Sequence, residues 1–281
     1  MNRSKWERRI QRAEELASAH PFAAEVLQFY KHIAGFQQAL YSHIETSYIE
    51  AANDNASNKK ASGLLPAGLL PEDLDLPLLL PKFSEFLSAV EKVAPQPIAQ
   101  SAADLNAQGD GRWQDLLTSY WRTAPDFQPT PEHTETLLAW IFLQPYAEYL
   151  ADHSKPVPHN ERTAVCPFCS GRPLVGVLRP EGDGAKRSLI CSLCSTEWTY
   201  GRIVCPACGE ETVEKLAIYT ASQFHQVRVE ACDTCHYYIK TVDLTKNGHA
   251  VPVVDELATI PLNLWAQEHQ YIKLQPNLLG I

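Results

Sequence analysis

The eight cysteines of the chain are the residues whose type and spacing most directly predict chemistry. All of them lie between Cys166 and Cys235, and residues 1–165 contain none. They form four C-x-x-C pairs, namely Cys166 with Cys169, Cys191 with Cys194, Cys205 with Cys208, and Cys232 with Cys235. Two thiolates at this spacing turn toward one ion, and two such pairs complete a tetrahedral site with sulfur–metal distances of about 2.3 Å for zinc. The spacing therefore predicts metal binding.

An internal repeat predicts which pairs share a site. The first half reads VCPFC, an insert over residues 170–190, and CSLC; the second reads VCPAC, an insert over residues 209–231, and CDTC. Each insert has the pattern of strand, turn and strand, and a hairpin brings its two ends together. We therefore expect one site from Cys166, Cys169, Cys191 and Cys194, and a second from Cys205, Cys208, Cys232 and Cys235.

Each predicted site holds one mononuclear ion, and four thiolates accept both iron and zinc. A redox motif of the thioredoxin kind needs a single C-x-x-C where a strand meets a helix, which this arrangement does not provide. The residue after the second cysteine of a pair often needs a left-handed backbone, and Gly209 adopts one without steric cost. His236 follows Cys235 directly, and we interpret it as an exposed turn residue because four cysteines already complete the site.

No catalytic motif accompanies the cysteines. The sequence contains no phosphate-binding loop, no G-x-G-x-x-G and no G-x-S-x-G. A site made of four protein thiolates also has no open position for substrate or water. We therefore expect a protein that is not an enzyme.

Composition limits the classes of partner. The chain has 281 residues, 33 acidic against 24 basic residues, a net charge of -9 and a hydrophobic fraction of 45%. This charge argues against a protein that mainly neutralises phosphates, and its apolar runs are far shorter than the roughly 20 residues of a membrane span. We expect neither nucleic-acid binding nor membrane insertion, and the sequence does not determine an oligomeric state.

The cysteine sites must be positioned by a scaffold, and the cysteine-free part of the chain has helical patterning. We expect helices over Ser4–His20, from Phe22 to about Ala52, and over Lys82–Val93, Arg112–Arg122 and Pro131–Leu150, the last with Thr130 as its N-cap and a kink at Pro145. The leucine- and proline-rich stretch over residues 63–81 is expected to be an extended strap packed on these helices, because its prolines forbid one continuous helix.

These patterns predict an α+β chain. A helical domain over residues 1–155 is followed by a four-cysteine module over 156–199, a second over 200–245 and a helical tail over 246–281. The spacing is typical of zinc-ribbon-like modules. Pro261 is expected to interrupt or start a helix in the tail, which packs back on one of the two domains.

The N-terminus predicts the compartment. MNRSKWERRIQRAEELASAH is charged throughout and has no apolar stretch, so we expect no export signal there. In the cytoplasm thiols stay reduced, and clustered cysteines bind metal more often than they form disulfides. We expect a cytoplasmic protein.

The motifs CPFCSGRP, LICSLCSTEWTYGRIVCPACG and EACDTCHYYIKT, with the ending DELATIPLNLWAQEHQYIKLQPNLLGI, resemble the FdhE-type formate dehydrogenase accessory proteins. The resemblance covers about residues 160–281. It implies two tandem rubredoxin-like modules that bind iron. It also implies a cytoplasmic assembly factor that binds the immature catalytic subunit and is required for formation of active respiratory formate dehydrogenase.

The resemblance leaves the use of the sites open. If they organise a surface for the partner, candidate contacts near the cysteine turns are Glu197, Trp198, Arg202, Tyr237 and Tyr238, although packing between the modules explains these aromatic residues equally well. Alternatively, an iron site exchanges electrons as in a rubredoxin-like carrier. A third hypothesis, a nucleic-acid-binding zinc ribbon, is disfavoured by the net charge of -9 and by the absence of a dense basic patch between Cys166 and Cys235.

Overall fold

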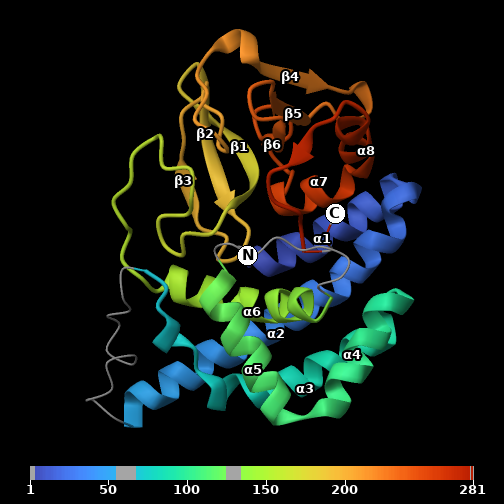
Figure 1. The fold of residues 1–281 in the computed structure, drawn as a ribbon, viewed down its shortest axis with the longest axis vertical. Coiled ribbons are helices and arrows are strands. Elements are labelled where there is room, and N and C mark those ends of the chain that lie inside the picture. The colour runs from blue at the N-terminus through green and yellow to red at the C-terminus, as the bar shows by residue number, and fades with distance from the viewer. Residues whose placement is uncertain (1–3, 55–67, 125–133, 279, 281) are drawn as a thin grey trace.

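The computed structural model describes residues 4–54, 68–124, 134–278 and 280. A layer of helices lies beneath a sheet, and a helix near the C-terminus lies between the two (Figure 1). The helical region contains α1 (Lys5–Ala19), α2 (Ala24–Asp54), α3 (Leu76–Val93), α4 (Gln96–Gln108), α5 (Asp110–Thr123) and α6 (Thr134–Asp152). The predicted α+β class, with helices first and a sheet that carries two four-cysteine clusters after them, is confirmed.

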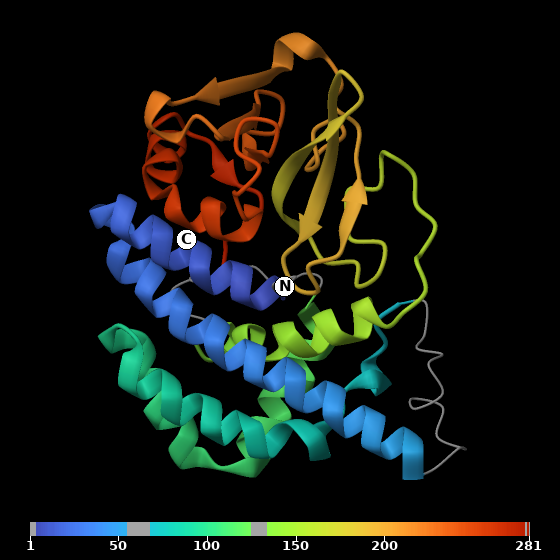
Figure 2. The same ribbon diagram turned by 180° about the vertical axis from the view of Figure 1, so that it is seen from behind.

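Helix α6 is the centre of the helical layer. Every residue from Leu137 to Leu150 is buried, as is typical of a helix that is apolar on all sides. It contacts α2, α4 and α5 within this layer, and the sheet lies on its other side (Figure 2). Helix α1 begins with a capping box, in which Ser4 Oγ accepts from the Glu7 amide at 3.1 Å and Glu7 Oε2 accepts from the Ser4 amide at 2.8 Å.

The expected strap is wrong over its second half. Helix α3 begins at Leu76 instead of Lys82, because Asp75 caps its first turn through the Leu78 amide and Pro77 lies in that turn, where no hydrogen bond is lost. Pro81 lies inside the helix. Helix α4 was not predicted from the sequence, because its buried residues include the small Ala99 and Ala102, which give a weak periodic signal. Thr130 lies outside the described residues.

The cysteine region forms a single sheet. It contains β1 (Pro173–Glu181), β2 (Gly184–Cys191), β3 (Glu197–Thr199), β4 (Leu216–Thr220), β5 (Val227–Cys232), β6 (Tyr237–Asp243) and the short β7 (Ile272–Lys273). The strand order is β3-β2-β1-β6-β5-β4, and β7 pairs with β6. Strands β1–β3 form one antiparallel unit, and β4–β6 form a second unit of the same kind in the same sheet. The two units correspond to the two halves of the sequence repeat.

The parallel pairing of β1 with β6 joins the two repeats. Gly176 is opposite Thr241 at this junction. A Cβ atom on Gly176 would lie 2.3 Å from Thr241 Oγ1, so only glycine permits this close approach.

The C-terminal helices α7 (Pro252–Ala258) and α8 (Ile260–Glu268) pack back on the chain, and Pro261 lies in the first turn of α8. The tail was expected to contact one domain, yet α7 contacts α1 and α2 as well as β1 and β6. Among the described residues, no helix has both the length and the apolar character needed to cross a membrane.

Candidate metal centres

The first cluster brings together Cys166, Cys169, Cys191 and Cys194, whose Sγ atoms all lie within 4.8 Å of one another. Cys166 and Cys169 lie in the turn before β1, whereas Cys191 ends β2 and Cys194 lies in the turn before β3. The Sγ separations are 3.5 Å for Cys166 and Cys194, 3.3 Å for Cys169 and Cys191, and 3.5 Å for Cys169 and Cys194.

The second cluster repeats this arrangement with Cys205, Cys208, Cys232 and Cys235, again within 4.8 Å. Cys205 and Cys208 precede β4, Cys232 ends β5, and Cys235 lies in the turn before β6. The Sγ atoms of Cys205 and Cys235 are 3.7 Å apart, as are those of Cys208 and Cys232.

Both clusters fit a single tetrahedral ion. With sulfur–metal bonds of about 2.3 Å, the sulfurs of such a site lie about 3.8 Å apart. The second cluster has this spacing, and the first is a few tenths of an ångström tighter. Four sulfur donors suit iron or zinc and exclude the hard cations that prefer oxygen.

The backbone of each C-x-x-C turn repeats one geometry. The residue after the second cysteine is left-handed in all four, with φ of 60° at Ser170, 54° at Ser195, 77° at Gly209 and 59° at His236. The sequence predicted this for Gly209 alone. His236 is exposed and lies outside the cluster.

Amide groups and a glycine surround the sulfurs. The Leu193 amide lies 3.4 Å from Cys191 Sγ, and the Ala207 amide lies 3.4 Å from Cys205 Sγ, as expected for donors that stabilise thiolate charge. A Cβ on Gly171 would lie 3.2 Å from Cys169 Sγ and 3.3 Å from Cys191 Sγ. A side chain at this position would therefore require the two sulfurs to move by a few tenths of an ångström.

The two clusters differ in burial. All four cysteines of the first are buried, and burial raises the pKa of Cys191 and Cys194 well above the ordinary thiol value. In the second cluster Cys208 is exposed and Cys235 is half-buried. An ion in the first cluster would be sealed from water, and one in the second would be reached from the surface.

The helical layer holds the first cluster in place. Gln144 Nε2 donates to the Ser192 carbonyl at 3.0 Å, and the Ser195 hydroxyl donates to Glu148 Oε1 at 2.7 Å. Glu148 is fully buried and pairs with Arg9 of α1 at 2.8 Å. Arg9 Nη2 also donates to the Ser195 hydroxyl at 3.1 Å, so α1 and α6 both contact the turn that carries Cys194.

The five candidate partner contacts lie in different environments. Trp198 and Tyr238 are each only 2% exposed; the Trp198 indole donates to the Thr163 carbonyl, and the Tyr238 hydroxyl donates to Asn263 Oδ1 in α8. Glu197 forms two hydrogen bonds of 2.7 Å with Arg179. Arg202 is exposed and Tyr237 is half-buried, and these two line a pocket beside the second cluster together with Tyr238.

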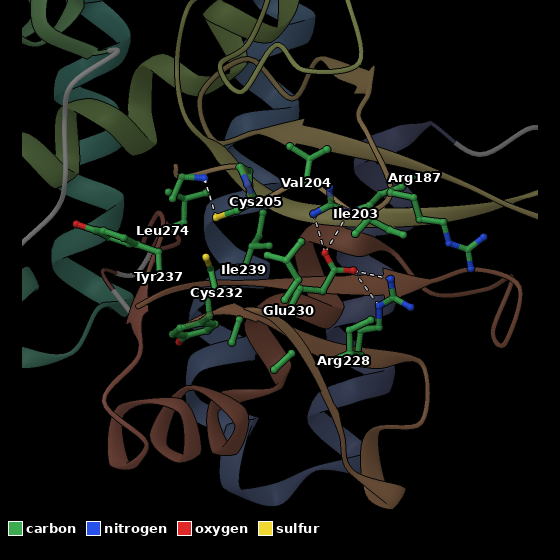
Figure 3. Close-up of a pocket in the computed structure, with 18 of the residues that line it drawn as sticks. Arg187, Ile203, Val204, Cys205, Arg228, Glu230, Cys232, Tyr237, Ile239 and Leu274 are labelled. Carbon is green, nitrogen blue, oxygen red and sulfur yellow. Dashed lines mark hydrogen bonds and ion pairs between the residues drawn. The ribbon is translucent and has the colours of Figure 1, made fainter. Parts of the chain in front are cut away.

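An ion network that was not predicted from the sequence lies at this pocket. Arg187 of β2 donates to Glu230 Oε2 at 3.0 and 2.6 Å, and Arg228 donates to Oε1 at 2.9 and 2.6 Å (Figure 3). Although burial opposes it, the two guanidinium groups hold the pKa of Glu230 below its ordinary value. The alternation in RVEAC places Arg228 and Glu230 on the same face of β5 as Cys232, a signal that was available in the sequence. Arg187 lies on β2, and only the strand order of the folded sheet brings it close to Glu230 on β5.

Comparison with known proteins gives two family matches. The description "FdhE, central domain" matches residues 165–202, and "FdhE, C-terminal domain" matches residues 203–279. The Protein FdhE homolog of Aquifex aeolicus is 36% identical over 141 residues, which is 50% of either chain. That of Pseudomonas aeruginosa is 35% identical over 130 residues, 44% of this chain and 41% of the relative. The chain thus matches about half the length of these relatives or less.

A longer alignment and a solved structure extend the similarity into the helices. The Protein FdhE homolog of Rhizobium meliloti is 31% identical over 212 residues, which is 72% of this chain and 66% of the relative. The crystal structure of the FdhE protein from Pseudomonas aeruginosa superposes with a TM-score of 0.73 over 99% of this chain and 97% of that chain, at 23% identity. At that identity the superposition shows a common fold.

Proposed function

Because the chain belongs to the FdhE family, we propose that it is an accessory factor that binds the immature catalytic subunit of respiratory formate dehydrogenase and is required for formation of the active enzyme. The link to formate dehydrogenase comes from the resemblance of the cysteine motifs. We place this activity in the cytoplasm, where the eight thiols stay reduced and available to metal.

The observation that supports this role is the unequal burial of two otherwise matched clusters. The first is buried against α1 and α6, as suits a structural ion. The second lies at the surface, where Cys208 is exposed and Cys205 and Cys232 line the pocket. A metal in the second cluster would order the surface that meets the partner.

We propose that the chain does not itself turn over formate. The eight cysteines would hold two mononuclear ions, and four thiolates around each leave no position for a substrate. Iron, favoured by the family resemblance, would add one-electron redox chemistry, whereas zinc would be structural. The exposure of Cys208 favours electron transfer at the second cluster as a second candidate function.

Affinity capture tests the proposal. The tagged chain is recovered from cytoplasm that produces respiratory formate dehydrogenase, and bound proteins are identified by mass spectrometry while bound metal is measured in parallel. We expect the catalytic subunit with the unaltered chain and with Leu264→Ser, a change at an exposed position of α8. The double variant Cys205→Ser/Cys208→Ser should lose both the subunit and one metal per chain.

Two results would contradict the proposal. Recovery of nucleic acid or ribosomal proteins without the catalytic subunit would favour the zinc-ribbon hypothesis. A stable, reversible redox couple at the second cluster, with formate dehydrogenase formed normally in the absence of the chain, would favour the electron carrier.

A further inference from the structure

The sheet beside the second cluster has an uncovered edge. Strand β4 is the last strand in the order and pairs with β5 alone among the described strands. Its outer amide and carbonyl groups can therefore accept another strand. Three large aliphatic side chains are exposed beside it, Ile218 at 56%, Val213 at 60% and Ile203 at 49%. Exposed aliphatic residues next to a free strand edge mark an interaction surface.

A pocket of about 260 Å³ opens on this surface. Its apolar wall includes Leu216, Ala231, Ile239 and Leu274. Cys205 and Cys232 lie at one end and Glu230 with its two arginines at the other, with Ile239 between them (Figure 3). The space suits one or two aliphatic side chains.

The charges around the pocket are unbalanced. Three arginines, Arg187, Arg202 and Arg228, line it together with one carboxylate, Glu230. Glu230 already accepts from Arg187 and Arg228. Arg202 is exposed and has no ion pair within the described part of the chain. Arg202 is thus an exposed cation at this pocket that can pair with a carboxylate of a partner.

We infer that β4 and this pocket bind an extended, acidic segment of a partner polypeptide, which adds a strand to β4, inserts an aliphatic side chain beside Ile239 and places a carboxylate on Arg202. Strand addition supplies backbone hydrogen bonds, and pockets for alternate side chains supply selectivity. The free edge and aliphatic wall favour a peptide over a nucleic acid, whose bases would need aromatic surfaces for stacking. The inference rests on the proposed function in one respect, that the segment belongs to the immature catalytic subunit.

Binding of designed peptides to the metal-loaded full chain tests the surface directly. Two labelled eight-residue peptides are compared by fluorescence anisotropy, one alternating leucine with glutamate and the other leucine with lysine. We expect the glutamate peptide to bind about tenfold tighter or more, because the lysines would meet like charges. Arg202→Glu should abolish or reverse this preference.

The apolar part of the site is tested by Ile218→Asp, which should weaken the glutamate peptide by about tenfold or more because it adds a like charge at an apolar contact. Both altered side chains are exposed in the unaltered protein, and the thermal unfolding midpoint checks that the variants fold. Leu264→Asp is the matched control, since Leu264 is 55% exposed on α8 away from the pocket. It should leave binding unchanged.

The outcomes separate this inference from the proposed function. The docking site is wrong if the two peptides bind with equal affinity, if neither binds, or if Ile218→Asp leaves the affinity unchanged. It is also wrong if a labelled thymidine oligonucleotide binds and the peptides do not. If the unaltered chain captures the catalytic subunit and Ile218→Asp/Arg202→Glu captures it equally, the docking site is wrong and the proposed function stands. If the unaltered chain captures no subunit but discriminates the peptides, the proposed function is wrong and the peptide site stands.

Discussion

At the scale of single residues, the four left-handed positions hold the cysteine turns in the shape that aims two sulfurs at one point. Three of the four are not glycine, and a residue with a side chain at positive φ is held there by surrounding contacts at a cost of about 1–2 kcal/mol. Amides of these residues donate back into the turn, as from Ser170 to the Cys166 carbonyl at 2.8 Å and from His236 to the Cys232 carbonyl at 2.8 Å.

Gly209→Ala tests the cost of this conformation. A Cβ at Gly209 meets nothing within 4 Å, so the expected loss of about 1 kcal/mol in the free energy of unfolding comes from the φ of 77° alone. Gly111→Ala in α5 is the matched control, because its added Cβ also meets nothing within 4 Å but its φ is not positive. It should be neutral or stabilising by up to about 1 kcal/mol. Urea unfolding measures both; equal effects would contradict the argument.

The sequence allowed the grouping of the cysteines to be predicted because C-x-x-C pairs and hairpin patterns are local signals. The Arg187–Glu230 pair was not predictable in this way, because Arg187 lies on β2 and Glu230 on β5. Their contact depends on β1 and β6 being neighbours in the sheet. Such information is contained in long-range pairing and not in any short motif.

At the scale of elements, the two cysteine units have the same strands and different neighbours. The first has α6 against its second cysteine turn, through the contacts of Gln144 and Glu148. The second turn of the other unit, with Cys235, lies at the surface and is followed by the exposed His236. A metal ion should therefore leave the second cluster more readily than the first.

Removal of metal by a chelator should proceed in two phases. We expect the fast phase to come from the second cluster, with little change in helix content, and the slow phase to coincide with loss of the helical signal, because the first cluster is part of the main core. Metal release is followed with a coloured chelator, and helix content by circular dichroism at 222 nm, the usual helix band.

Variants assign the two phases. Cys208→Ser should remove the fast phase and leave the helical signal, whereas Cys194→Ser should remove the slow phase and lower the thermal unfolding midpoint. A single phase, or a fast phase that survives Cys208→Ser, would show that burial does not govern the release of metal.

Helix prediction failed where local signals conflict. Prolines normally argue against a helix, but Pro77 lies in the first turn of α3 and the buried face of this helix, with Leu79, Phe83 and Phe86, compensates for Pro81 in its interior. Helix α4 buries only Ala99, Ala102 and Leu105, so its periodicity was too weak to detect. In both α3 and α4, packing against the rest of the protein stabilises a helix that the local sequence signals do not predict.

At the scale of the whole molecule, the C-terminal segment ties the helices to the sheet. Arg12 of α1 forms hydrogen bonds of 2.9 and 2.6 Å with the buried Asp255 of α7. The neighbouring Glu256 is also fully buried, with Lys240 of β6 at 2.9 Å and Lys273 of β7 at 2.5 Å. The sequence predicted a tail that packs back but not that its carboxylates connect the layers, because their partners lie in distant elements.

The buried Glu256 predicts how stability depends on pH. Burial alone would raise its pKa, but the charges of Lys240 and Lys273 lower it to about 2 from the ordinary value of 4.5. The folded state therefore holds this carboxylate ionised where the unfolded chain would protonate it. Its contribution to stability is fully present above pH 4.5 and is lost as pH falls from 4.5 toward 2.

Glu256→Gln isolates this contribution. Near pH 6 the variant should unfold with a free energy lower by about 3–5 kcal/mol, because Lys240 remains buried without its counter-charge. The difference from the unaltered protein should shrink as pH falls below 4.5, while loss of metal in acid affects both proteins alike. Measurements stay at pH 6 and below, because burial lowers the pKa of Lys240 to about 7 and half of this lysine would be deprotonated at that pH.

Glu14→Gln is the control for this comparison, since Glu14 pairs with Lys31 at 3.0 Å on an exposed surface. It should change the free energy of unfolding by less than about 1 kcal/mol. Urea unfolding at a series of pH values measures all three proteins. A difference between the unaltered protein and Glu256→Gln that stays constant from pH 6 down to the acid transition would show that the pKa of Glu256 is the same in the folded and unfolded states, and that the lysines do not stabilise its charge.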